Sequence, residues 1–166
     1  MKRHITTIQK GFTLIELLIV ITIIVALAVT VFVALNPVQR LKDARDARRT
    51  ADVETILTAI HEAIVDNKGT LPSNMGGAGA EIQIGNGSSG CAIATGGCSV
   101  VATVCADIMT GSTNVAKYLK SQPTDPTGGV TYTASKSGYS VAVDVNGLIT
   151  VKACGTEGST NISQSR

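Results

Sequence analysis

The chain has 166 residues, a formal net charge of +2, 16% charged residues and 3% aromatic residues. That length allows one modest globular unit once the long apolar segment near its beginning is subtracted. The small net charge argues against nucleic-acid binding, and the few aromatic residues argue against a site that grips a large ligand. The composition therefore fits a small anchored protein.

An apolar run of 24 residues extends from Phe12 to Leu35, and Glu16 is its one charged residue. As a helix this run is about 36 Å long, which exceeds the roughly 30 Å of a bilayer's hydrocarbon core. A carboxylate within such a segment costs on the order of 2.5 kcal/mol, so residues of this kind normally have a partner. We therefore expect a cation to pair with Glu16.

A short basic leader, residues 1–11, precedes the apolar run and ends at Gly11. An ordinary secretory signal would be cut after its apolar region, and that region would be lost. A cut after Gly11 would instead remove the leader and keep the hydrophobic helix. It would also create an ammonium group at Phe12, one helical turn from Glu16, which supplies the missing cation.

Residues 10–21, from Lys10 to Ile21, resemble the processing and methylation site of type IV pilins and of the pseudopilins of type II secretion systems. In that family a membrane-embedded aspartic prepilin peptidase cuts after the glycine and methylates the new terminal phenylalanine. The resemblance implies that Gly11 is the cleavage residue, Phe12 the methylated terminus and Glu16 the residue that pairs with a neighbouring subunit during assembly. The alternative is a generic single-span anchor with an incidental glutamate.

After the apolar run, Asn36 and Pro37 either start a new helix or kink a continuous one. Apolar residues then recur every three or four positions and form one stripe of an amphipathic helix: Val53, Ile56, Leu57, Ile60 and Ile64. We assign residues 12–35 to a transmembrane and polymerisation helix and residues 36–68 to this amphipathic helix. Together they resemble the stalk of a pilin.

Residues 40–52 are charged nearly all round the expected helix. One interpretation is a solvated face with intrahelical ion pairs such as Asp43 with Arg40, each worth a few tenths of a kcal/mol. Another is contact between subunits of a filament, where alternating charges set the register. A nucleic-acid patch is a minor alternative, because Asp43, Asp46 and Asp52 dilute the basic charge and no aromatic residues interleave it.

Residues 69–166 form the expected head, which begins with glycine-rich loops and one short strand at residues 81–84. Short helices are expected at residues 101–109 and 114–120. Three strands with β-branched residues follow, and Asn146-Gly147 predicts a two-residue hairpin turn between the last two: residues 130–134, 139–145 and 148–153. The resulting meander would cover the apolar stripe. The predicted class is α+β, with a long N-terminal helix packed on a small antiparallel sheet.

All four cysteines lie in this head: Cys91, Cys98, Cys105 and Cys154. An even number in a small exported domain indicates disulfides and places the head outside the cytoplasm. Four cysteines permit three connectivities; we favour Cys91 with Cys98 and Cys105 with Cys154, at about 2–4 kcal/mol each. Zinc is the competing interpretation, but no Cys-x-x-Cys pair exists and both histidines lie elsewhere.

Residues 122–129 and Tyr132 also resemble the Asp-Pro-containing loop that precedes the sheet in major pseudopilins and related pilins. By this weaker resemblance Asp125 and Asp144 are candidate calcium ligands. The alternative is that both are turn or strand-surface carboxylates, because the sequence shows no clustered set of oxygen ligands.

No catalytic constellation stands out, so we expect neither enzymatic activity nor a cofactor. The sequence is interpreted as a prepilin, inserted as a single span in the cytoplasmic (inner) membrane and cut by prepilin peptidase. Assembly machinery would then build it into a homo-oligomeric filament, extracellular or periplasmic. A type IV pilus for adhesion, motility or DNA uptake, without direct nucleic-acid binding, is the first choice. A type II secretion pseudopilin is the alternative, and a nonpolymeric membrane-anchored binding domain is a distant one.

Overall fold

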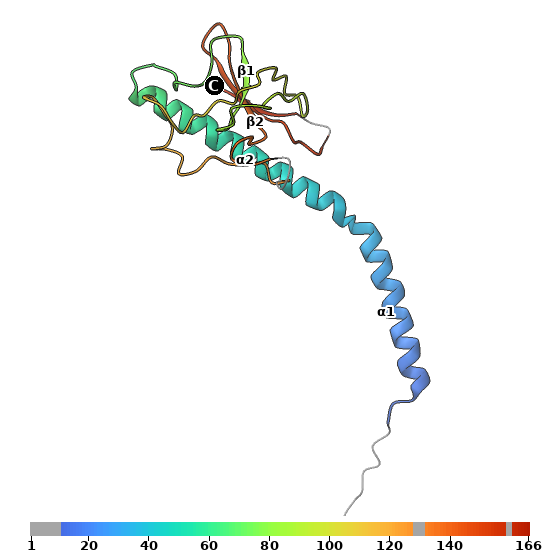
Figure 1. Cartoon of the computed structure of the whole chain (residues 1–166). Helices are drawn as coiled ribbons and strands as arrows, with labels where there is room; N and C mark the ends of the chain where they lie inside the picture. The colour runs from blue at the N-terminus through green and yellow to red at the C-terminus, as the bar shows by residue number, and fades with distance from the viewer. Residues whose placement is uncertain (1–10, 128–131, 159–160) are drawn as a thin grey trace, which may run out of the picture. The chain divides into compact units, whose positions relative to one another are not determined.

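The computed structural model describes residues 11–127, 132–158 and 161–166 (Figure 1). Among these residues two helices come first and four strands follow, which is the α+β layout predicted from the sequence. The chain divides into two compact units, one that ends at Arg40 and one that comprises Leu41–Arg166.

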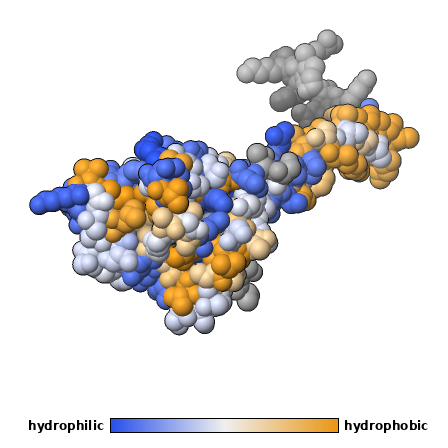
Figure 2. Space-filling view, turned by 90° about the horizontal axis from the view of Figure 1, so that it is seen from above, coloured by the Kyte–Doolittle hydropathy of each residue, from blue (hydrophilic) through white to orange (hydrophobic). Residues whose placement is uncertain are grey.

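Helix α1 (Leu14–Leu35) contains the apolar run, and none of its residues is buried. Figure 2 shows its hydrophobic side chains in orange. A capping box starts the helix: the Thr13 hydroxyl accepts a hydrogen bond from the Glu16 N–H (3.3 Å), and the Thr13 N–H donates to the Glu16 carboxylate (2.9 Å). By length and composition, the helical stretch that includes α1 is the one described segment able to cross a membrane.

The first helix ends where Asn36 adopts a left-handed backbone conformation with φ of 39°. Asparagine tolerates this conformation better than most residues, and the next residue, Pro37, is favoured in a first helical turn. Helix α2 (Pro37–Asp66) therefore starts as a separate helix, which is one of the two outcomes predicted for this dipeptide.

The inward face of α2 carries the predicted apolar stripe. Seven of its residues are buried: Arg49, Val53, Ile56, Leu57, Ala59, Ile60 and Ala63. The helix ends near the predicted stop, where Gly69 has φ of 89° and its N–H donates to the Ile64 carbonyl (2.8 Å). Figure 1 shows α2 lying along one face of the sheet.

Four antiparallel strands form one sheet in the order β1-β2-β3-β4. They are β1 (Glu81–Gln83), β2 (Tyr139–Val143), β3 (Ile149–Ala153) and β4 (Ile162–Ser165). Strands β2 and β3 pair from Tyr139↔Ala153 to Val143↔Ile149, so the predicted hairpin is confirmed. Its connection spans residues 144–148 rather than two residues, because the Asp144 carboxylate accepts hydrogen bonds from the N–H groups of Asn146 (2.8 Å) and Leu148 (2.7 Å).

The rest of the sheet differs from the predicted meander. The short strand expected at residues 81–84 is present as β1, and it occupies the place beside β2. Of the strand expected at residues 130–134, residues 130 and 131 lie outside the described residues, and Thr133 forms only an isolated bridge with Lys136. Strand β4 was not predicted; it pairs with β3 through its backbone, and only its first residue, Ile162, is hydrophobic.

The short helices predicted at residues 101–109 and 114–120 are wrong, since turns and isolated bridges occupy these described residues. The first segment is extended by tertiary pairing: the Ala106 N–H donates to the Gln83 carbonyl (2.8 Å), and the Gly85 N–H donates to the Ala106 carbonyl (3.0 Å). In the second, a single turn closes where the Leu119 N–H donates to the Val115 carbonyl (2.9 Å). Long-range contacts thus override local helix propensity.

The main hydrophobic core lies between α2 and the sheet. Ile56 and Ile60 of α2 have no exposed surface, and they belong to the same buried cluster as Tyr139, Val141 and Val151. Ile64 packs against this cluster at its edge. The sheet therefore covers the apolar stripe, as the sequence predicts.

Candidate functional site

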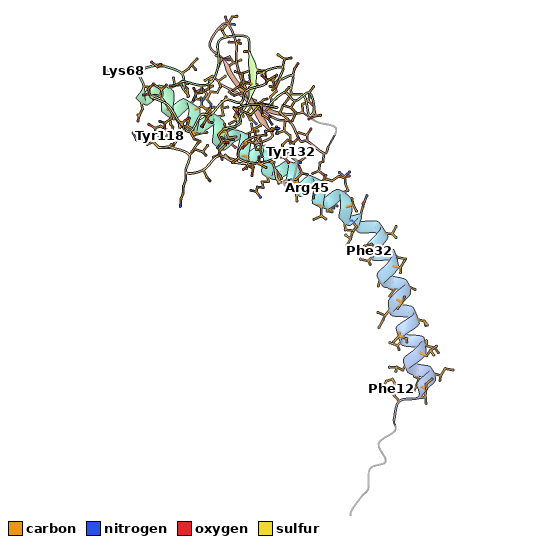
Figure 3. The ribbon with its side chains drawn as sticks, in the orientation of Figure 1. Phe12, Phe32, Arg45, Lys68, Tyr118 and Tyr132 are labelled. Atoms are coloured by element: carbon orange, nitrogen blue, oxygen red, sulfur yellow. A yellow bond between two sulfur atoms is a disulfide. The ribbon has the colours of Figure 1, made fainter. Side chains whose placement is uncertain are left out.

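The predicted processing residues lie together where the chain enters α1. Gly11, Phe12 and Thr13 are not helical, and Phe12 has 85% of its surface exposed. Apart from Gly11 itself and its two chain neighbours, no described residue has a heavy atom within 4 Å of the position that a Cβ at Gly11 would occupy. Figure 3 shows Phe12 at the N-terminal end of α1. The described part of the chain therefore leaves the peptide bond between Gly11 and Phe12 uncovered.

Glu16 is held by Thr13 in this form of the chain. Its Oε2 accepts hydrogen bonds from the Thr13 N–H (2.9 Å) and the Thr13 hydroxyl (2.8 Å). The carboxylate also lies at the positive end of the α1 dipole. Among the residues that the structure describes, no ion pair includes Glu16, so its expected cation must come from elsewhere.

A second polar cluster fastens α2 to two loops of the head. The guanidinium of Arg49 is fully buried and donates to Asp125 through Nε (2.7 Å) and Nη2 (2.8 Å). Its Nη1 donates to Asp46 (2.6 Å) and to Glu157 (3.2 Å). Burial by itself lowers the pKa of Arg49, but the carboxylates outweigh it and raise that pKa above its usual value.

The loop after β3 completes this cluster through Glu157. Arg45 donates to Glu157 through Nε (2.5 Å) and Nη2 (2.6 Å), and Figure 3 shows Arg45 on α2. These bonds and those from Arg49 hold the pKa of Glu157 at about 2, against the opposing effect of burial. Asp46 accepts hydrogen bonds from the N–H groups of Glu157 (3.2 Å) and Gly158 (2.8 Å). The loop is thus bound through both its backbone and its side chain.

Farther along α2, Asp52 accepts a hydrogen bond from the Tyr139 hydroxyl (2.7 Å). Burial, followed by the neighbouring Asp52 carboxylate, raises the pKa of Tyr139 far above its usual value. The charged stretch at residues 40–52 is therefore neither wholly solvated nor wholly available to another subunit. Its inward residues, Arg45, Asp46, Arg49 and Asp52, bind the head of their own chain, a role that neither interpretation drawn from the sequence included. The intrahelical pairs expected there are also present, since Arg49 pairs with Asp46 and Arg48 with Asp52.

The predicted disulfide pairing is wrong. The structure joins Cys91 to Cys105 and Cys98 to Cys154, and no described cysteine is free. The first bridge closes a loop within the segment before β2, and the second connects that segment to the end of β3. Spacing in the sequence could not select between the three possible connectivities.

The disulfide of Cys154 also adjoins the loop that carries Glu157. The next residue, Gly155, passes so close to Asp125 that a Cβ there would lie 2.5 Å from the Asp125 Oδ2. A side chain at this position would displace the carboxylate that binds Arg49. Glycine is therefore required at residue 155 by close approach, independently of its backbone angles.

The two candidate calcium ligands lie in separate parts of the head and have other partners. Both oxygens of Asp125 accept hydrogen bonds from Arg49, and Oδ1 also accepts from the N–H of Thr127 (2.9 Å). Asp144 caps the β2–β3 connection. Within the described ranges, no three His, Cys, Asp or Glu side chains are grouped so that they could hold a metal ion.

Sequence reasoning missed the polar cluster between α2 and the head, although one signal was present. Arg49 precedes Val53 by four residues, so it continues the buried spacing of Val53, Ile56 and Ile60. A charged residue on the buried face of a helix requires a partner of opposite charge. Nothing local to Asp125 or Glu157 identifies them as that partner.

Residues 7–32 match the family model described as the prokaryotic N-terminal methylation motif. This motif is the signature of type IV pilin and pseudopilin precursors, which are structural subunits, and it implies processing by prepilin peptidase and assembly into pili or pseudopili. The match includes Gly11, Phe12, Glu16 and most of α1, and α1 itself fits a membrane anchor. Comparisons with curated proteins and with solved structures found no match.

Proposed function

We propose that the chain is the precursor of a type IV pilus subunit, cut after Gly11 and assembled through its N-terminal helix into a homo-oligomeric filament. In this proposal residues 1–11 are the leader, 12–35 the transmembrane and polymerisation helix, 36–68 the amphipathic helix and 69–166 the head. One observation carries the proposal: the methylation motif occurs at the start of a helix that buries no residue in its own chain.

Cleavage converts the Phe12 nitrogen into an ammonium group, and N-methylation leaves it cationic. In the membrane, the low dielectric strengthens attraction between this cation and the Glu16 carboxylate of a neighbouring subunit. Each α1 helix then buries its apolar surface against other subunits. The mechanism is mechanical, since adding subunits from the membrane or returning them to it lengthens or retracts the filament, which serves adhesion, motility or DNA uptake.

The proposed route begins in the cytoplasmic membrane, with prepilin peptidase and the assembly machinery as partners, and ends in an extracellular filament. Two disulfides in the head support its exposure to an oxidising compartment. A periplasmic pseudopilus of type II secretion is the second candidate, favoured by the resemblance of residues 122–129 to the loop of major pseudopilins. Loss of twitching or DNA uptake on deletion supports the pilus, whereas periplasmic retention of secreted proteins supports the pseudopilus.

The direct test is to shear filaments from producing cells, pellet them and determine the N-terminus of the subunit by mass spectrometry. We expect the mature chain to begin with N-methylated Phe12. Gly11→Ala should reduce processing less than a bulky replacement such as Gly11→Leu, because a peptidase that cuts after glycine accepts the smaller side chain more readily. Filaments whose subunit retains Met1 would refute the processing step, and a subunit that stays in the membrane without filaments would favour a nonpolymeric anchor.

A further inference from the structure

We propose that the outward face of α2 docks against a second copy of this chain, with Arg48 of one subunit in an acidic groove of the next. The outward face comprises the exposed α2 residues opposite the buried stripe: Ala47, Arg48, Ala51, Glu54, Thr55, Thr58 and Glu62. This inference rests on the proposed filament, and it assigns a contact between heads that is separate from the packing of α1.

Charge is distributed unevenly along α2. From Arg40 to Arg49 the helix has five basic and two acidic residues, whereas from Asp52 to Asp66 it has four acidic residues and no lysine or arginine. The two halves therefore have opposite sign. Two copies of such a helix attract each other when one is shifted along the other, because the basic half then faces the acidic half.

The structure separates the charges used within the subunit from those left for a neighbour. Asp66 is paired with Lys117 (2.5 Å) and accepts a hydrogen bond from Tyr118. Arg48, by contrast, has a side chain that is 63% exposed, and its ion-pair contact to Asp52 is long, at 3.7 Å. The side chains of Glu54 and Glu62 are exposed and make no hydrogen bond or ion pair to any residue that the structure describes.

These two free carboxylates line one groove. It has a volume of about 380 Å³ and runs between α2 and Tyr118, and Figure 3 shows Tyr118 beside the helix. Its lining residues are mostly small or acidic: Ala51, Glu54, Thr55, Thr58, Ala59, Glu62 and Tyr118. Small side chains allow another helix to approach closely, and a guanidinium matches a carboxylate in shape as well as charge. The groove therefore suits an arginine from a second α2.

The spacing of the two charges also suits a polymer. Arg48 and Glu62 are 14 residues apart, which corresponds to about 21 Å along the helix. In the proposed filament the α2 helices of neighbouring subunits run in the same direction, so a contact between Arg48 of one subunit and Glu62 of the next leaves each subunit with one free donor and one free acceptor. Head-to-tail contacts of this kind extend into a helical filament when their rotation does not close a ring.

Charge reversal in the full-length chain tests the contact in cells that assemble it. We expect Arg48→Glu and Glu62→Arg each to lower the yield of sheared filaments about tenfold, because each places like charges in contact. The double variant restores attraction, and its yield should return to within about twofold of the native yield. Lys120→Glu is the matched control: it makes the same charge change as Arg48→Glu at an exposed residue that belongs neither to α2 nor to the lining of the groove, and its yield should stay native.

A cross-link locates the contact directly. A subunit carrying Arg48→Cys and Glu62→Cys should form a ladder of multimers when intact filaments are treated with a short bis-maleimide, because the native cysteines are all in disulfides. Non-reducing peptide maps of the membrane pool verify that each variant folds, and Arg48→Gln and Glu62→Gln replace any variant that does not. Native yields for the substituted chains and no ladder would overturn the docking surface and leave the filament intact. Absence of filaments from the native chain would instead overturn the proposed function.

Discussion

Arg49 and Asp125 form a fully buried ion pair across 76 residues of sequence, with Nε–Oδ2 and Nη2–Oδ1 distances of 2.7 and 2.8 Å. Neither side chain retains any exposed surface. The two parallel hydrogen bonds fix the orientation of the loop before Thr127 relative to α2. Since both ions are removed from water, each depends on the other, and the loss of one leaves an uncompensated buried charge.

We expect Arg49→Met and Asp125→Ala each to lower the free energy of unfolding by about 3–5 kcal/mol. Urea denaturation of the full chain in detergent, followed by circular dichroism, measures this change. The matched control is Arg48→Met, at a neighbouring position whose side chain is 63% exposed, and it should change stability by no more than about 0.5 kcal/mol. Equal effects at the two arginines would contradict the structural role of the buried pair.

Acid should weaken the attachment of the Glu157 loop. Hydrogen bonds from Arg45, followed by those from Arg49, hold the pKa of Glu157 at about 2 in the folded chain, against 4.5 for the free group. Because the folded value is the lower one, this stabilisation is complete above pH 4.5 and is lost as pH falls through 2. Denaturation curves at several pH values should show this decline in the native chain. Glu157→Gln should reduce its slope, while Glu54→Gln on the outward face should not.

The regular elements could be predicted where the sequence itself repeats. The apolar stripe of α2 and the strand signals of β2 and β3 predict one helix and two strands, and the structure contains all three. The prediction of two short helices was wrong because the pairing of Ala106 with Ile84 and the contacts around Val115 depend on distant residues. Strand β4 was not predicted because its pairing with β3 uses backbone groups, which leave little pattern in the side chains.

The same division applies to the candidate sites. Gly11, Phe12 and Glu16 form a local motif, so the sequence alone identified them and the family model matches the same segment. The contacts of Arg49 with Asp125 and Glu157 join residues more than 70 positions apart, and no local pattern encodes them. The predicted cysteine connectivity was wrong for the same reason, since it depends on which strands and loops become neighbours in the fold.

The two disulfides should differ in their contribution to stability. The chain-entropy model assigns about 4 kcal/mol to the bridge between Cys98 and Cys154, with its separation of 56, and about 3 kcal/mol to that between Cys91 and Cys105, with its separation of 14. Replacing each pair with alanine and comparing urea denaturation tests this order. Thermolysin digestion without reductant should first confirm the connectivity, because no lysine or arginine separates the first three cysteines. A Cys91–Cys98 peptide would disprove it.

Removing the Glu16 charge should lower filament assembly more than removing the Thr13 hydroxyl. Glu16→Gln removes the charge but leaves the exposed Gly11–Phe12 bond unchanged, so we expect normal cleavage and less than about a tenth of the native filament yield. Thr13→Val removes the hydroxyl that donates to the Glu16 carboxylate (2.8 Å) and accepts from the Glu16 N–H (3.3 Å). The lost cap is worth about 1 kcal/mol, which corresponds to about fivefold in yield. The control is Thr22→Val, because the native Thr22 hydroxyl donates to the Ile19 carbonyl (2.8 Å) within the same helix.

Gel mobility measures leader removal, and the pellet of sheared filaments measures assembly. Native yield from Glu16→Gln would exclude charge pairing as the basis of assembly, whereas native yield from Thr13→Val alone would show that Glu16 acts without the capping box.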